Sequence, residues 1–121
     1  MSRLAGHVDG LVVRFRIEAG NGEVVDADLD TGFTGQIALD SAASGRLAFT
    51  GPVALASVEL GDGTRIDTPV DQGVLQWFGA PREVQAILTT SPDAAFGMAL
   101  LTDVVIHVDM PGRAAYLELP S

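Results

Sequence analysis

The sequence predicts a small all-β fold, either a barrel or a sandwich, on two observations. Short runs rich in Val, Ile, Leu and Phe recur along the chain, and turn signals separate them about every ten residues. With 121 residues and 47% hydrophobic content, the chain is large enough to bury a core of its own. Because it shows no linker, low-complexity tract or repeat, we expect residues 1–121 to form a single domain.

The N-terminal part of the chain reads as a β-hairpin. From Val13 onward, residues 11–17 alternate apolar side chains with two arginines, which is the pattern of a half-buried strand. The Gly-Asn-Gly cluster at 20–22 tolerates positive φ and predicts a turn, after which residues 24–29 return as a second strand.

The rest of the chain continues with short strands and tight turns. Further strands are expected at residues 36–39, 53–60, 64–70, 73–78, 82–88, 104–109 and 115–119. Turns at 61–63 and 79–81 predict two more hairpins. Residues 98–102 are the best helix candidate, 89–93 are expected to form a loop, and 41–45 fit either one helical turn or a loop.

Composition excludes several classes of function. The chain has 7 basic against 16 acidic residues and a net charge of -9, with no basic cluster, which disfavours a nucleic-acid partner. It has no cysteine, so disulfides, thiolate nucleophiles and cysteine-ligated zinc are ruled out, and a reducing cytoplasm is the expected location. Residues 1–9 lack the apolar stretch of a secretory signal, and no apolar run approaches the roughly 20 residues of a membrane span.

The sequence Asp30-Thr31-Gly32 follows the second predicted strand and occurs once. An Asp in this position can polarise a water, the Thr hydroxyl can hydrogen-bond across a dimer axis, and the Gly lets the backbone approach a second carboxylate. Two carboxylates about 3 Å apart cannot both ionise, so one serves as base and the other as acid. A single copy of the motif therefore predicts a homodimer, unless the chain lacks this chemistry altogether.

The order of motifs resembles the retropepsin-type aspartic proteases, the single-domain group that includes retroviral proteases and small bacterial relatives. The strand at 24–29 and the loop at 30–35 resemble the family's catalytic loop, and Gly61-Asp62-Gly63 falls where the family has its flap. Residues 73–79 and 84–88 resemble the next hairpin, and 95–101 the family's second signature, in which a Gly opens a short helix.

The resemblance implies a small closed barrel of acid-protease type with one short helix in the C-terminal half. It implies an endopeptidase that cleaves peptide bonds as a homodimer without a metal or cofactor. The residues it assigns are catalytic Asp30, the loop-supporting Thr31, Gly32 and Gly97, and the flap or substrate-binding Gly61, Asp62, Gly63 and Thr34. The segment before residue 11 and the strand at 115–119 are candidates for a sheet between the two subunits.

The chain departs from the family pattern at several positions. Ala99 stands where relatives have Asp or Asn, Asp62 makes the flap tip acidic, and Phe33 and Thr34 replace a small-then-acidic pair. Two alternatives therefore stay open. One is a retropepsin-fold module that dimerises or binds peptides without cleaving them, and the other is a β-barrel whose Asp-Thr-Gly is coincidental.

Other candidate sites have weaker patterns. Asp26, Asp28 and Asp30 share the spacing of a calcium loop, but its Gly and Glu positions are not filled, and we expect solvated carboxylates at 26 and 28 and no metal. His107 alternates with apolar neighbours and is expected to face solvent. Trp77 is expected to pack in the core or on the sheet. No Gly-x-Ser-x-Gly motif supports a serine nucleophile.

Overall fold

The structure is a computed structural model that describes residues 2–59 and 62–120. Its elements in chain order are β1 (Ser2–Asp9), β2 (Val12–Ala19), β3 (Val24–Leu29), β4 (Ile37–Leu39), α1 (Ser41–Arg46), β5 (Thr50–Glu59), β6 (Arg65–Trp77), β7 (Ala80–Leu88), β8 (Ala94–Phe96), the 3-10 turn η1 (Met98–Leu100), β9 (Val105–Asp109) and β10 (Ala114–Leu119). The prediction of an all-β fold is confirmed.

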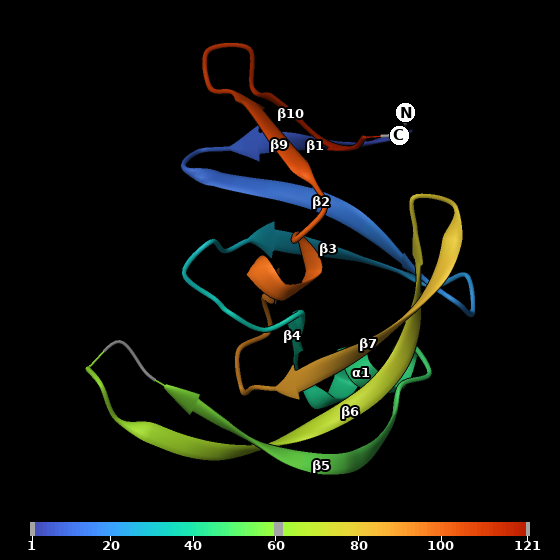
Figure 1. Ribbon diagram of the computed structural model, residues 1–121, viewed down its shortest axis with the longest axis vertical. Coiled ribbons are helices and arrows are strands. Elements are labelled where there is room, and N and C mark those ends of the chain that lie inside the picture. The colour runs from blue at the N-terminus through green and yellow to red at the C-terminus, as the bar shows by residue number, and fades with distance from the viewer. Residues whose placement is uncertain (1, 60–61, 121) are drawn as a thin grey trace.

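All ten strands belong to one sheet, in the order β5-β6-β7-β4-β8-β3-β2-β1-β10-β9. The far end of β6 also pairs with β2, through Glu18 opposite Gln76 and Ala19 opposite Leu75. This pairing closes a ring of six strands, β2-β3-β8-β4-β7-β6. In Figure 1 the β5–β6 hairpin extends from the ring on one side, and β1, β10 and β9 lie on the opposite side.

The strands β3, β8, β4 and β7 position the candidate catalytic loop. β3 runs parallel to β8, β8 antiparallel to β4, and β4 parallel to β7. β3 and β4 therefore lie on either side of β8, and the chain between them, residues 30–36, must cross the end of β8. This crossing brings the Asp-Thr-Gly sequence next to the chain that leaves β8.

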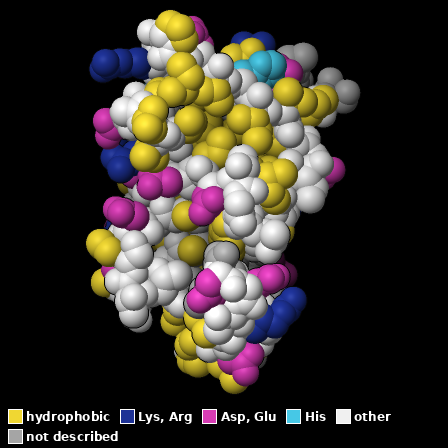
Figure 2. All heavy atoms as spheres, turned by 90° about the vertical axis from the view of Figure 1, so that its left-hand side faces the viewer, with side chains coloured by type: hydrophobic (Ala, Val, Ile, Leu, Met, Phe, Trp, Pro, Cys, Tyr) yellow, Lys and Arg dark blue, Asp and Glu magenta, His cyan; other side chains and the backbone are white. Residues whose placement is uncertain are grey.

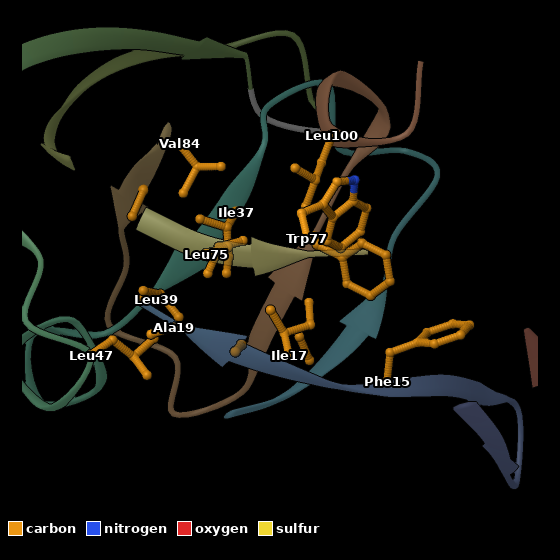
Figure 3. Close-up of a cluster of buried hydrophobic side chains, with 14 of the residues drawn as sticks. Phe15, Ile17, Ala19, Ile37, Leu39, Leu47, Leu75, Trp77, Val84 and Leu100 are labelled. Carbon is orange, nitrogen blue, oxygen red and sulfur yellow. The ribbon is translucent and has the colours of Figure 1, made fainter. Parts of the chain in front are cut away.

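The core fills the ring with side chains from nearly every strand (Figure 3). Phe15 of β2 and Phe96 of β8 are both fully buried and meet edge to face, with ring centroids 5.6 Å apart. Trp77 is buried and packs edge to face on Phe78, with centroids 5.1 Å apart, which confirms its expected role in packing. Burial of these aromatic and aliphatic side chains is the main favourable term for the fold.

The two helical segments are shorter or placed differently than the sequence suggested. The helix candidate at 98–102 is the single 3-10 turn η1. The undecided stretch at 41–45 is the six-residue helix α1, which Asp40 caps by accepting a hydrogen bond from Ala43 N–H at 2.8 Å. A side-chain acceptor at this position satisfies an N–H group that the first helical turn leaves free.

The strand boundaries differ from expectation in three places. The strands expected at 64–70 and 73–78 are one strand, β6, because its pairing with β7 runs without a break from Val70 to Trp77. The three-residue β8 was not expected. β1 was expected only as part of a sheet between subunits, and in the structure it makes a hairpin with β2 through the turn at Gly10 and Leu11.

The strand expected at 115–119 is β10, and it pairs within its own chain, while a sheet between subunits that involves the N-terminal segment stays a prediction. β10 pairs with β1 on one side, from Ser2 opposite Leu119 to His7 opposite Ala114, and with β9 on the other side. Both edges of β10 are therefore occupied within one chain, so β10 has no free backbone edge to offer a second chain.

Candidate active site

Asp30 begins the loop that follows β3, and its backbone is fixed to the end of β8. Asp30 N–H donates to the Phe96 carbonyl at 3.0 Å, which continues the parallel β3–β8 pairing by one step. Its side chain turns back on the loop, where Oδ1 accepts the Gly32 N–H at 3.0 Å. The Asp30 residue is exposed.

Gly97, which directly follows β8, supports the loop of residues 30–36 by close backbone contact. The chain leaving β8 makes three hydrogen bonds to the loop, from Gly97 N–H to the Gln36 carbonyl at 3.0 Å, from Met98 N–H to the Phe33 carbonyl at 2.9 Å, and from Ala99 N–H to the Gly35 carbonyl at 3.2 Å. A Cβ on Gly97 would lie 2.4 Å from the Phe33 carbonyl oxygen. Only a glycine leaves room for the loop to lie this close.

Gln36 is a loop-supporting residue that the sequence did not reveal. Its Oε1 accepts the backbone N–H of Gln85 at 2.7 Å, beside the point where β4 begins to pair with β7. The side chain thereby satisfies a strand N–H that β4 does not reach, and it ties the end of the loop to β7. The two residues are 49 positions apart, so no local pattern in the sequence could indicate the contact.

A cleft of about 940 Å³ opens beside the loop and beneath the β5–β6 hairpin. It is lined by the loop (Gly32, Phe33, Thr34, Gly35, Gln36), by the hairpin (Ala56, Ser57, Glu59, Arg65, Val70, Gln72), by β7 (Glu83, Val84, Gln85, Ile87) and by Ala99. Its walls are mixed, with apolar side chains between polar ones. The volume of this cleft is within the range of ligand sites in proteins.

Asp30 itself lines a smaller depression of about 430 Å³ on the neighbouring surface. Leu11 on the β1–β2 turn and Ser91 and Asp93 on the loop before β8 line the same depression. Asp30 therefore stands between two hollows, because Gly32, two residues later in the same loop, lines the large cleft.

The β5–β6 hairpin occupies the place of the predicted flap. Asp62 and Gly63 lie in its turn, and Gly61 lies outside the described residues. Asp62 Oδ1 accepts the Thr64 N–H at 2.9 Å, and Gly63 has a φ of +87°. Hydrogen bonding to Thr64 lowers the pKa of the Asp62 carboxyl below its ordinary value.

The structure thus brings together most of the residues that the sequence singled out. Asp30, Gly32 and Gly97 meet at the loop, and Thr34 is exposed in the large cleft. Thr31 is exposed, and its hydroxyl makes no hydrogen bond within the part of the chain that the structure describes. Asp62 and Gly63 do not line the described cleft or the smaller depression.

The acidic residues of β3 pair with arginines of β2. Arg14 lies 2.8 Å from Asp28 and 3.0 Å from Asp9, and Arg16 lies 3.6 Å from Asp26. The hydrogen bond to Asp28 raises the pKa of Arg14 above its usual value. Asp28 is therefore half-buried and ion-paired rather than solvated as expected. Within residues 2–59 and 62–120, no three His, Asp or Glu side chains are arranged to hold a metal ion.

His107 is partly exposed, and its ring packs on a neighbouring strand instead of projecting fully into solvent as the sequence suggested. Its ring stacks on Tyr116, with centroids 4.1 Å apart, and its Nε2 lies 3.6 Å from a carboxylate oxygen of Glu118. Cross-strand pairing of β9 with β10 places His107 directly opposite Tyr116, which explains the stack.

Figure 2 shows the side of the molecule toward which the flap tip and the β3–β4 loop project in Figure 1. Hydrophobic side chains gather over the upper half of this face, and acidic side chains lie across its middle.

Within the part that the structure describes, no helix is long and apolar enough to span a membrane.

Comparisons with known proteins support the fold. No family model matches the sequence, and no curated protein does. Among solved structures, a retropepsin-like aspartic protease from Rickettsia conorii matches with a TM-score of 0.66, covering 95% of this chain and 89% of that chain at 13% sequence identity. The likeness lies in the fold, and it agrees with the resemblance read from the sequence. The chain therefore has the retropepsin-like fold.

Proposed function

We propose that this protein is an aspartic endopeptidase that acts as a homodimer, with Asp30 of each copy at a shared two-fold axis. One observation supports this most strongly. Asp30 is an exposed carboxylate at the end of β3, on a loop that Gly97 holds by close backbone contact and that opens into a large cleft beneath a hairpin. A rigidly supported carboxylate beside a peptide-sized cleft is the arrangement that this chemistry needs.

The paired carboxylates activate a water without a metal or cofactor. One Asp30 is ionised and removes a proton from the water, while the other is protonated and donates to the carbonyl oxygen of the peptide bond. The hydroxide adds to the carbonyl carbon. The tetrahedral diol then collapses as the leaving nitrogen takes the proton that the first Asp30 removed from water, and a hydroxyl of the diol returns a proton to the second Asp30. The peptide lies extended beneath the flap, where backbone hydrogen bonds bind it and side-chain pockets set preference.

A second copy of the chain is needed because each chain has one Asp-Thr-Gly sequence. Leu11 supports this proposal, since it is 92% exposed and lines the same depression as Asp30. A large apolar side chain held in solvent beside the candidate catalytic residue is favourably buried by a partner. In this proposal the hydroxyl of Thr31, which is exposed, hydrogen-bonds across such an axis.

Digestion of a proteome-derived peptide library tests the proposal, with wild type and Asp30→Asn compared from acidic to neutral pH. We expect Asp30→Asn, which keeps the shape of the side chain but not its charge, to lose cleavage by about a thousandfold or more. Asp103→Asn, at an exposed position outside both hollows, is the matched control and should cleave as wild type does. Equal cleavage by wild type and Asp30→Asn, or a monomer at high concentration in analytical ultracentrifugation, would refute the proposal.

A second candidate function is a peptide-binding module that does not cleave. Ala99 favours it. Among the described residues, the chain leaving β8 holds the loop by backbone hydrogen bonds, whereas members of the family that the chain resembles add a polar side chain at this position. A dimer that binds library peptides but leaves wild type and Asp30→Asn equally inactive would favour this reading.

A further inference from the structure

The large cleft continues into a second depression along β6 and β7. This depression has a volume of about 580 Å³, and it lies toward the turn between β2 and β3, with Gly20, Asn21, Thr50 and Pro81 in its walls. Gln72 and Glu83 line both hollows. The two hollows therefore adjoin at Gln72 and Glu83, and together they form a groove that runs from Gly32 of the catalytic loop past Glu83.

Glu83 is the residue at this junction that carries charge. It lies on β7, where exposed Glu83 and Gln85 alternate with buried Val84 and Ala86. On β6 its neighbour is Val74, which is partly exposed and cannot pair with a carboxylate. The Glu83 side chain consequently faces the groove, and its carboxylate is hydrated when no ligand is bound.

No cation of the described chain neutralises Glu83. The seven basic residues are all arginine, and none in residues 2–59 or 62–120 forms an ion pair with Glu83. The nearest arginine in sequence, Arg82, donates instead to the Leu100 carbonyl at 3.3 Å. Arg65, the cation in the cleft wall, lies 3.9 Å from Glu59. The groove thus holds two carboxylates against one guanidinium, in a protein whose net charge is -9.

We propose that Glu83 is a specificity-determining residue that binds a lysine or arginine side chain of the peptide substrate. The inference rests on the proposed function of the cleft. Apolar walls at Phe33, Val70 and Ile87 suit an apolar side chain of the same peptide nearer the catalytic loop. An extended peptide turns alternate side chains to the same face, so it can present an apolar and a basic residue along one groove. The acidic protein also attracts a basic peptide at long range.

The test uses pairs of octapeptides with capped ends. The two peptides of a pair differ only in having Lys or Gln at one position, and each position is tested in turn. Binding is measured to Asp30→Asn, which retains the groove, and cleavage is measured with wild type. We expect a Lys-over-Gln preference of about five- to tenfold at one position, in the range of a partly enclosed ion pair. Glu83→Gln should reduce the preference below about twofold, Glu83→Lys should favour Glu-containing peptides, and added salt should weaken the wild-type preference.

Glu18→Gln is the control, because Glu18 is exposed on β2 and lines neither hollow of the groove. It should keep the full preference. Cleavage without a Lys preference, or a preference that persists in Glu83→Gln, overturns this inference and leaves the proposed protease standing. A Lys preference in binding that depends on Glu83, together with no cleavage by wild type, supports the groove and overturns the protease. No binding and no cleavage overturns both.

Discussion

Replacing Gly97 with Ala places a methyl group inside the contact between the chain leaving β8 and the candidate catalytic loop. The new Cβ would lie 2.4 Å from the Phe33 carbonyl oxygen, 2.6 Å from Cδ2 of the same residue and 2.7 Å from the Gly35 carbonyl oxygen. Two of these three atoms are backbone, so no side-chain rotation relieves the overlap. The loop must retreat by about 1 Å to restore ordinary van der Waals separations.

The cost follows from the contacts that this retreat disturbs. Overpacking of a tight site costs about 1–3 kcal/mol. The hydrogen bonds that Met98 and Ala99 donate to Phe33 and Gly35 join the same two segments, and each contributes about 1 kcal/mol net. We expect Gly97→Ala to lower the free energy of unfolding by about 3 kcal/mol. If the protein is a protease, a loop misplaced by about 1 Å should also lower kcat/KM by about a hundredfold.

Urea denaturation measures the change, and Gly45→Ala is the matched control. Gly45 lies in α1, is exposed, and a Cβ there meets no atom within 4 Å. Because Ala is the better helix former, Gly45→Ala should raise the free energy of unfolding by about 0.5–1 kcal/mol. If Gly97→Ala unfolds within about 0.5 kcal/mol of wild type, the reasoning that the loop is held by close backbone contact is refuted.

Two further predictions concern polar groups. Ser44→Ala removes the hydroxyl that donates to Asp71 Oδ2 at 2.6 Å. The other oxygen of this buried carboxylate has no partner among the described residues. Urea denaturation should therefore show that the free energy of unfolding falls by about 2 kcal/mol. The exposed Ser41→Ala in the same helix should change it by less than about 0.5 kcal/mol, and equal effects would contradict the buried contact. In an NMR titration, the Asp62 carboxyl should have its midpoint below the unfolded value of about 3.9. Since the pKa of the Asp62 carboxyl is lower in the folded state than in the unfolded state, its ionisation stabilises the folded protein above the unfolded pKa. This stabilisation is lost as the pH falls through the folded pKa. A midpoint at or above about 3.9 would contradict the Thr64 hydrogen bond.

The sequence predicted those parts of the fold that local chemistry determines. Glycine-rich turns located the hairpins at 20–22 and at the flap, and alternation located β2. The Asp-Thr-Gly sequence and Gly97 were recognised because they resemble the two signatures of the retropepsin family. Each of these features is encoded within a few neighbouring residues.

The features that the sequence missed depend on distant partners. β8 is only three residues long and two of them are alanine, a poor strand former, yet it is a strand because β3 and β4 pair with its two sides. β1 has a weak apolar pattern and is held between β2 and β10. The contacts of Gln36 with Gln85 and of Ser44 with Asp71 join residues 49 and 27 positions apart. Such contacts appear only once the topology is known.

The length of β6 determines where the flap can bend. From Val70 to Trp77 the strand is paired with β7, and the Thr68 hydroxyl donates to the Leu88 carbonyl at 2.8 Å just before that region begins. Between Arg65 and Asp67, the same strand has β5 as its neighbour in the sheet. A two-stranded ribbon is more compliant than a strand supported on both sides. We therefore expect β6 to bend more easily between Arg65 and Asp67, where it pairs with β5, than between Val70 and Trp77, where it pairs with β7.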